Sequence, residues 1–327
     1  MVAGRFIVTT GRSGSTLMSQ LLREHPAVLS LSEFFAMLHA PSLPAFPSEP
    51  LTGDEFWALL STPRQEVVSI VQQCGAPVDP ETLQRKVAPP LLMMALPLLA
   101  NDPVAVHEEV GSYVRGLPRA DSGTQYSRLF DWLCQRFSRQ VWVERSGGST
   151  GFLPELLRRW PEGRYLHLVR DGRSVTLSMA PRRGFRLAAA AGGLDVLDRA
   201  KASAEDLIAA AVARTGTGTV ALERFGAMWA QQVVATNERL RALPAGQVLQ
   251  MRYEDLVHDP ARELEHLVDF FGIAELTPET WLRWAASQVQ GREQPWRELP
   301  EPDRSRLEAA CLPGLRIFGY SVRAGQS

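Results

Sequence analysis

The stretch that decides the fold lies at the start of the chain and reads Phe6-Ile7-Val8-Thr9-Thr10-Gly11-Arg12-Ser13-Gly14-Ser15-Thr16-Leu17. Its apolar first part predicts a short buried strand, and its small, polar second part predicts a loop that opens a helix. Backbone N–H groups in such a loop, together with the positive end of the helix dipole, form a binding site for anions. The stretch therefore predicts a phosphate or sulfate ligand.

This loop differs from the Walker A loop that grips nucleoside triphosphates. A Walker A loop requires Gly-x-x-x-x-Gly-Lys followed by Ser or Thr. When Gly14 is aligned with the second glycine, Thr9 stands in place of the first glycine and Ser15 in place of the lysine. The cation inside the loop is Arg12, two residues before Gly14. The loop thus suits a phosphate group but is poorly equipped for a magnesium-bound triphosphate.

Two later segments also combine a strand with a polar turn. Residues 164–178 read RYLHLVRDGRSVTLS, and residues 247–257 read QVLQMRYEDLV. In the first of them, Arg170 ends the predicted strand, Asp171 is in position to cap the following helix, and Ser178 lies two turns into that helix.

Together and in this order, the three segments resemble the sulfotransferases that use 3′-phosphoadenosine 5′-phosphosulfate (PAPS), the bacterial members in particular. The resemblance covers roughly residues 6–272 and is thin over 41–139 and 181–222. It implies that Arg170 and Ser178 hold the 3′-phosphate of PAPS, and that no metal is needed. It also implies that the 5′-phosphosulfate is bound by the first loop, through Gly11, Arg12, Ser13, Gly14, Ser15 and Thr16.

The resemblance further implies the groups that carry out sulfuryl transfer. Arg12 stands where many members have lysine and would stabilise the leaving phosphate by hydrogen bonding, because arginine does not give up its proton. Glu33 stands where bacterial carbohydrate sulfotransferases and tyrosylprotein sulfotransferases place a glutamate that acts as general base. Ser30 and Glu33 also have the spacing of a capping box, so a structural role for Glu33 is an alternative. His107 and His39 are rival bases.

A fourth segment, residues 144–148 (ERSGG), stands in place of the family's Glu-Lys-Thr-Pro motif, with Arg145 instead of lysine and Ser146 instead of threonine. Arg145 would orient the sulfuryl group or the acceptor. In the alternative interpretation, Glu144 and Arg145 form a structural pair beneath the site.

Residues 291–297 (GREQPWR) resemble the family's C-terminal loop that closes over the nucleotide. There, Arg292 or Arg297 would reach the 3′-phosphate and Trp296 would cover the adenine. Residues 253–255 are interpreted as structural, because they link the last predicted strand to its helix.

The composition indicates a globular enzyme. The chain has 327 residues, 45% of them hydrophobic, and a formal net charge of −1. That near-neutral charge argues against nucleic acid as the main partner. Cys74, Cys134 and Cys311 form no Cys-x-x-Cys pair, which suits a reducing compartment. We expect no signal peptide before the first strand, and the longest apolar run, 88–100, is too short to span a bilayer. These features predict a cytoplasmic protein without a transmembrane segment.

Strands and helices alternate along the chain, which predicts an α/β fold of the three-layer P-loop type. Its mainly parallel central sheet would be flanked by helices in a single domain, 1–327, with helical or loop insertions at 41–139 and 181–222 that shape the acceptor site. The predicted strands are 5–10, 140–144, 165–169 and 248–252, and the predicted helices are 15–24, 152–160, 174–179, 223–243 and 261–271. Ligands of such sheets bind beyond the carboxyl ends of the strands, where Arg12, Glu144, Arg145 and Arg170 fall.

The sequence thus predicts a sulfotransferase that acts on a hydroxyl of a small-molecule, lipid or carbohydrate acceptor, and a homodimer is one assembly compatible with it. Apolar side chains in and near the first insertion could line an acceptor site, although such residues more often form core: Phe34, Phe35, Met37, Phe46, Phe56, Trp57, Met93 and Met94. Two alternatives stay open. One is a P-loop kinase or NTPase, which would need the lysine and a strand-borne aspartate for magnesium. The other is a catalytically inactive nucleotide-binding protein.

Overall fold

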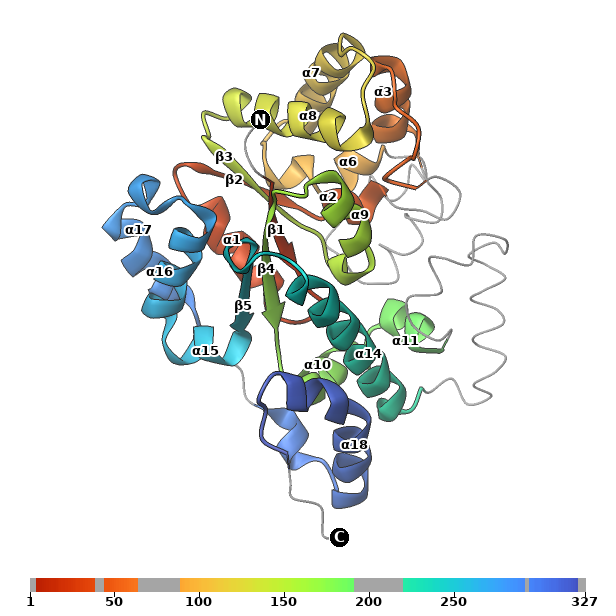
Figure 1. Cartoon of the computed structure of the whole chain (residues 1–327), viewed down its shortest axis with the longest axis vertical. Helices are drawn as coiled ribbons and strands as arrows, with labels where there is room; N and C mark the ends of the chain where they lie inside the picture. Colours follow the sequence, from red (N-terminus) through yellow and green to blue (C-terminus); the bar gives the residue numbers. More distant parts are fainter. Residues whose placement is uncertain (1–3, 39–43, 64–88, 191–219, 292–293, 323–327) are drawn as a thin grey trace.

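Five parallel strands form the central sheet, in the order β2-β3-β1-β4-β5 (Figure 1). They are β1 (Arg5–Val8), β2 (Val28–Ser32), β3 (Val141–Arg145), β4 (Arg164–Val169) and β5 (Val248–Arg252). All four residues of the central strand β1 are buried, as expected for a parallel sheet covered on both faces. The predicted α/β fold with a mainly parallel sheet is confirmed.

The computed structural model describes residues 4–38, 44–63, 89–190, 220–291 and 294–322. Of the residues singled out from the sequence, His39, Cys74 and Arg292 lie outside these ranges, as does most of the second predicted insertion. Among the described helices, none combines the length and the apolar character needed to cross a membrane.

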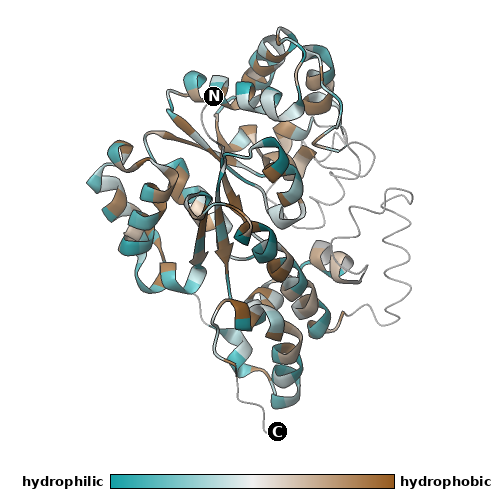
Figure 2. Ribbon diagram, in the orientation of Figure 1, coloured by the Kyte–Doolittle hydropathy of each residue, from teal (hydrophilic) through white to brown (hydrophobic). Residues whose placement is uncertain are grey.

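Helices cover both faces of the sheet, and the strands supply a core to each face. Side chains alternate along β1, so that Phe6 and Val8 join one apolar cluster while Ile7 joins the other. The strands are mostly brown in Figure 2, and the surrounding helices carry much of the teal. On the first face lie α2 (Phe34–Leu38), α3 (Gly53–Ser61), α6 (Pro90–Met93), η1 (Leu96–Leu98), α7 (Pro103–Arg115), α8 (Ser122–Arg136) and α9 (Leu153–Arg159).

The second face is covered by α1 (Ser15–Arg23), α15 (Tyr253–His258), α16 (Pro260–Phe271) and α17 (Glu279–Gln288). A third cluster joins α10 (Gly172–Met179), α11 (Arg183–Ala190), α14 (Leu222–Arg241) and α18 (Glu301–Ile317), which lie together below the sheet in Figure 1. Short 3-10 turns complete the described elements: η2 (Ser149–Gly151), η3 (Ala245–Gln247), η4 (Ala274–Leu276) and η5 (Pro295–Glu298).

Strand β2 was not predicted, and it changes the surroundings of Glu33. Its sequence, VLSLS, carries two serines in a strand whose five residues are all buried. These polar groups are satisfied locally, since the Ser30 hydroxyl donates to the Ser19 carbonyl at 3.0 Å. Because β2 pairs with β3 up to Ser32 opposite Arg145, Glu33 comes directly after a strand end at the carboxyl edge of the sheet.

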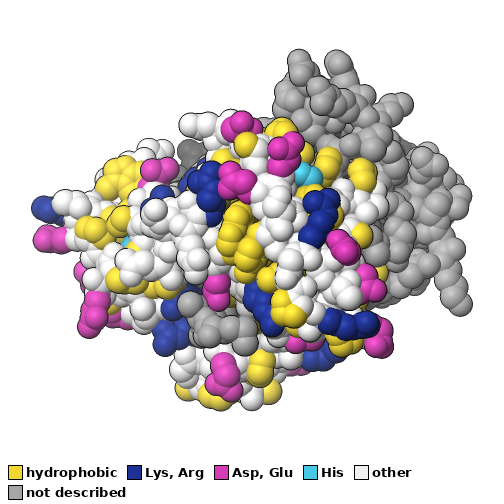
Figure 3. All heavy atoms as spheres, turned by 90° about the horizontal axis from the view of Figure 1, so that it is seen from above, with side chains coloured by type: hydrophobic (Ala, Val, Ile, Leu, Met, Phe, Trp, Pro, Cys, Tyr) yellow, Lys and Arg dark blue, Asp and Glu magenta, His cyan; other side chains and the backbone are white. Residues whose placement is uncertain are grey.

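The described parts of the first predicted insertion are largely helical, but many of its apolar residues are core. Six of the aromatic and methionine side chains considered for the acceptor site have 0–6% of their surface exposed: Phe34, Phe35, Met37, Phe46, Phe56 and Met93. The four phenylalanines among them belong to the core of the first face, so the core interpretation is confirmed for these four. On the face seen in Figure 3, side chains of both charges are interspersed with hydrophobic ones, in keeping with the near-neutral net charge.

Candidate functional site

The loop between β1 and α1 has the backbone geometry of an anion-binding turn. Gly11, Arg12 and Gly14 all adopt the left-handed conformation, with φ of 83°, 58° and 93°. Gly14 is the N-cap of α1, and a Cβ built on it would lie 2.3 Å from the Tyr253 ring. Glycine is therefore required at position 14 both by its backbone conformation and by the closeness of Tyr253.

The hydroxyl residues of this loop have different surroundings. Ser13 is fully buried, and its Oγ lies 3.1 Å from Thr10 Oγ1 and donates to the Gly11 carbonyl at 3.2 Å. Ser15 is buried in the first turn of α1, whereas Thr16 is exposed. The Ser13 side chain thus fixes the shape of the loop, and the backbone N–H groups are the part of the loop suited to an anion.

The structure brings the first loop together with the second predicted phosphate-binding segment. Arg12 Nε donates to Ser178 Oγ at 2.9 Å, and Arg170 Nη1 donates to the Arg12 carbonyl at 3.3 Å. Arg170 follows β4 and is 8% exposed, while Ser178 lies in α10. Asp171 accepts a hydrogen bond from the N–H of Arg173 and caps α10, as predicted.

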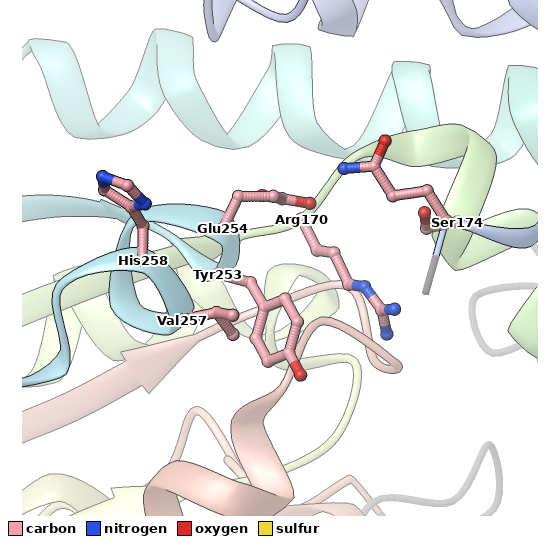
Figure 4. A pocket seen from close by; sticks show the side chains of 7 residues that line it. Arg170, Ser174, Tyr253, Glu254, Val257 and His258 are labelled. Atoms are coloured by element: carbon pink, nitrogen blue, oxygen red, sulfur yellow. The ribbon is translucent and has the colours of Figure 1, made fainter. Parts of the chain in front are cut away.

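A pocket of about 360 Å³ opens beside Arg170 (Figure 4). It is lined by Arg170, Ser174, Tyr253, Glu254, Val257, His258 and Gln294. The Arg170 guanidinium lies 4.7 Å from the centre of the Tyr253 ring, and His258 and Ser174 lie at opposite ends of the pocket. An arginine beside an aromatic face is a combination that can bind both a phosphate and a planar base.

Six of the seven lining residues were missed by sequence reasoning as members of the site: Ser174, Tyr253, Glu254, Val257, His258 and Gln294. Ser174 is one helical turn before Ser178 on the same side of α10, a spacing that could have identified it. Tyr253, the first residue after β5, was interpreted from the sequence as structural, and the structure places it at the pocket.

Glu254 does have the structural role predicted for it. Its carboxylate accepts hydrogen bonds from the Asp171 N–H at 3.0 Å and the Tyr320 hydroxyl at 2.8 Å. Burial raises the pKa of Glu254. The carboxylate therefore ties α15 to the start of α10, on which Ser174 and Ser178 are placed.

Glu33 and Arg145 form an ion pair at the carboxyl edge of β2 and β3. One carboxylate oxygen of Glu33 contacts Arg145 Nη1, and the other accepts the Gly147 N–H at 2.7 Å. Their side chains are 16% and 6% exposed. A Cβ on Gly147 would lie 3.2 Å from both carboxylate oxygens, so a side chain at this position would press on the carboxylate. Glu33 is thus held in one orientation by a charged group and a backbone donor.

The two pairings considered as structural alternatives, a Ser30–Glu33 capping box and a Glu144–Arg145 ion pair, are not found among the described side chains. Ser30 lies within β2 and bonds to Ser19, so Ser30 and Glu33 form no capping box. Among the described side chains, Arg145 pairs with Glu33, whereas Glu144 accepts a hydrogen bond from the Ser146 hydroxyl at 2.5 Å. Glu144 is 1% exposed, and burial raises its pKa to about 8.

The structure places His107 away from these groups. It lies in α7 and its ring is 4.8 Å from that of Trp57 of α3, in the helical layer of the first face. Burial lowers the pKa of His107. This arrangement gives His107 a packing role, and His39, the other rival base, lies outside the described residues.

Trp296 does not line the pocket. Its buried ring lies under the Arg173 guanidinium, 3.7 Å from ring centre to Cζ, and Arg173 is paired with Asp171 and Glu308. Arg297 is exposed and lies 5.4 Å from the same ring. Gln294, two residues earlier, is the residue of this loop found at the pocket.

These features define the class of protein as an α/β protein with a glycine-containing loop before the first helix and a polar pocket beside Arg170 at the carboxyl edge of a parallel sheet. The model of the sulfotransferase family matches residues 117–278, which contain β3, β4 and β5. This match identifies residues 117–278 as a sulfotransferase-family region.

Several solved structures are similar to the chain at low sequence identity. The sulfotransferase domain from the curacin biosynthetic pathway is 17% identical over 98% of this chain and 99% of that chain, with a TM-score of 0.48. The sulfotransferase domain from the olefin synthase of Synechococcus PCC 7002 is 20% identical over 98% and 95%, with a TM-score of 0.44. Sulfotransferase STF9 from Mycobacterium avium is 15% identical over 99% and 79%, with a TM-score of 0.47. No curated protein matches the chain.

Proposed function

We propose that this protein is a PAPS-dependent sulfotransferase, which transfers the sulfuryl group of PAPS to an acceptor hydroxyl and leaves adenosine 3′,5′-bisphosphate. The match to the family supports the reaction class. The observation that carries the proposal is that four neighbouring strands each deliver a charged residue to one edge of the sheet: Arg12, Glu33, Arg145 and Arg170. Ligands of such sheets bind at that edge.

The donor set fits a nucleotide with phosphates at two positions. The backbone N–H groups at the start of α1 suit the 5′-phosphate, and Gly14 allows close approach there. Arg170, with Ser174 and Ser178 on α10, suits the 3′-phosphate, and Tyr253 in the same pocket suits the adenosine. The pocket volume of about 360 Å³ lies within the range that small ligands occupy, roughly 300–1,000 Å³. We also propose that Arg297, or Arg292, which lies outside the described residues, reaches the 3′-phosphate.

PAPS, when bound, supplies an activated sulfuryl group attached to a phosphate. Glu33 would take the proton from the acceptor hydroxyl, since it is held at the carboxyl edge by Arg145 and Gly147. Arg12 would donate hydrogen bonds to the leaving phosphate, and Arg145 would keep Glu33 in place and contact the sulfuryl oxygens. As in phosphoryl transfer, we expect most of the rate enhancement to come from positioning and electrostatic stabilisation.

The acceptor is proposed to be a small molecule, a lipid or a carbohydrate that enters beside the first loop. A Cβ on Gly11 would lie 3.4 Å from the Phe185 ring of α11, so residues of the second insertion border the loop. This contact supports a role for the insertion at 181–222 in the acceptor site, and we propose the same role for the insertion at 41–139 within a single domain. A cytoplasmic location, and a homodimer as one possible assembly, are parts of the same proposal.

Calorimetric titration of adenosine 3′,5′-bisphosphate, with ATP and magnesium as comparator, tests the donor site directly. We expect the bisphosphate to bind to the wild type and to bind at least ~100-fold more weakly to Arg170→Ala, because that change removes charge-assisted hydrogen bonds worth roughly 1.5–3 kcal/mol each. Arg136→Ala is the matched control, since Arg136 is an exposed arginine paired with Glu109 in the helical layer.

A preference for ATP and magnesium would instead support the kinase alternative. Failure of either nucleotide to bind would contradict the proposal and support a protein without this activity. Equal loss of binding in Arg136→Ala and Arg170→Ala would show that the effect does not come from the pocket.

A further inference from the structure

Glu33 stands at the N-cap of helix α2 but does not cap it. The Glu33 carbonyl accepts the first helical hydrogen bond, from the Met37 N–H at 3.1 Å, which marks Glu33 as the residue before the helix. An N-cap side chain ordinarily accepts hydrogen bonds from the second or third helical N–H. The Glu33 carboxylate points elsewhere, to the Gly147 N–H and to Arg145.

The side chain that caps α2 comes from the residue after the neighbouring strand β3. Ser146 Oγ accepts the N–H of Phe35 at 3.0 Å and that of Ala36 at 3.1 Å, which are the second and third residues of α2. Its own proton is donated to Glu144 at 2.5 Å. Ser146 and Glu144 are 0% and 1% exposed, so this group is closed off from water. A hydroxyl more than 100 residues away in sequence thus does the work of the N-cap side chain.

We propose that Ser146 is a positioning residue for Glu33, because it caps α2 in place of the Glu33 carboxylate and so leaves that carboxylate directed at the reaction site. The proposal rests on the proposed role of Glu33 as general base. Its physical basis is competition between two acceptors. Without the Ser146 hydroxyl, two buried N–H groups lose their acceptor, which costs about 1–3 kcal/mol for each group.

Two carboxylates adjoin the N–H groups that would be left uncapped: Glu144, which already interacts with the Phe35 N–H, and Glu33, which belongs to the N-cap residue itself. If the Glu33 carboxylate turns back over α2 to replace the lost hydroxyl, it leaves the Gly147 N–H. Glu144 has a supporting role, because it accepts the hydrogen bond from the Ser146 hydroxyl. The Ser146 lone pairs are then available to accept hydrogen bonds from the two N–H groups. Ser146 thus determines whether the Glu33 carboxylate is directed at the N-terminus of α2 or at the reaction site.

The experiment compares three variants. Ser146→Ala removes the cap, and Ser146→Thr keeps a hydroxyl at the same place. Ser127→Ala is the matched control, because Ser127 is also buried, accepts from Trp160 Nε1 at 2.8 Å and donates to the Gly123 carbonyl at 2.9 Å. It lies in α8, and these hydrogen bonds reach neither Glu33 nor α2. Each variant is measured for bisphosphate affinity by calorimetry, for kcat and KM of PAPS with 4-nitrophenol as probe acceptor, and for the position of Glu33 in a crystal structure.

We expect Ser146→Ala to lower kcat by roughly 100-fold, the effect of about 1 Å of misplacement of a catalytic group, with KM for PAPS and bisphosphate affinity near wild-type values. Its Glu33 carboxylate should lie over α2, Ser146→Thr should restore most of the kcat, and Ser127→Ala should keep it. Unchanged kcat in Ser146→Ala, or an equal fall in Ser127→Ala, would overturn the proposal.

Failure of the wild type to bind the bisphosphate would contradict the proposed function, which is a separate outcome. If the wild type binds the bisphosphate but does not sulfate 4-nitrophenol, the crystal structures decide: a Glu33 carboxylate that still accepts the Gly147 N–H in Ser146→Ala refutes the positioning role.

Discussion

Replacing Glu144 with glutamine should remove a large pH-dependent loss of folding stability. Burial raises the pKa of Glu144 from 4.5 to about 8, with a smaller contribution in the same direction from Glu33, while the Ser146 hydrogen bond and Arg145 act in the opposite direction. Between these two pH values the folded protein keeps a proton that the unfolded chain releases. Stability is therefore fully present below pH 4.5 and falls as the pH rises toward 8.

The magnitude follows from the difference between the two pKa values. A difference of one bound proton changes the free energy of unfolding by about 1.4 kcal/mol per pH unit, so the ionisation of Glu144 removes at most roughly 5 kcal/mol. The glutamine amide does not titrate, and its oxygen can still accept the Ser146 hydroxyl. The stability of Glu144→Gln relative to wild type should therefore increase by about 3–5 kcal/mol between pH 5 and pH 8.5.

Urea unfolding followed by tryptophan fluorescence at half-unit steps from pH 5 to pH 9 measures this difference. Glu279→Gln is the control, because the Glu279 side chain is 80% exposed, and its curve should run parallel to that of the wild type. If Glu144→Gln and the wild type lose stability in parallel across this range, Glu144 is ionised in the folded protein and the reasoning is refuted.

Two further substitutions test the loop and the base. Gly14→Ala places a Cβ 2.3 Å from the Tyr253 ring at a φ of 93°. We therefore expect this variant to lose about 1–3 kcal/mol of folding stability and to lose bisphosphate binding. A variant that binds and melts like the wild type would contradict the loop geometry. Glu33→Gln should lower kcat for the 4-nitrophenol probe by about 100- to 10,000-fold while the bisphosphate affinity stays within about twofold, and wild-type turnover would assign the base to another residue.

The strands that the sequence predicted share a strong local signal. The apolar runs that form β1, β4 and β5 end within two residues of the predicted positions, because polar residues follow each run in the sequence. Strand β2 was missed because Ser30 and Ser32 interrupt its apolar pattern, and their burial depends on hydroxyl partners such as Ser19 that come from a different element. A polar residue in a buried strand can be recognised only when its partner is known.

In the candidate site, too, some residues could be predicted from the sequence and others only from the tertiary structure. The spacing of Arg170 and Ser178 placed them on a strand end and the helix that follows it, and the structure connects both to Arg12. The pocket residues Tyr253 and Gln294 come from segments whose approach to Arg170 is set by the packing of α15 and η5. Helix propensity and motif spacing carry no information on that approach.

The sequence alone determined most of the alternation of strands and helices, and it predicted an anion-binding loop at residues 9–16, because both inferences depend on neighbours within a few residues. Only the tertiary structure decided what Glu33 does. Its spacing from Ser30 fits a helix cap, whereas the pairing of β2 with β3 brings Arg145, Ser146 and Gly147 to it from more than 100 residues away. Ser146 then takes over the cap and the Glu33 carboxylate faces the edge of the sheet. Such a contact is fixed by burial and strand register, which involve the whole chain at once.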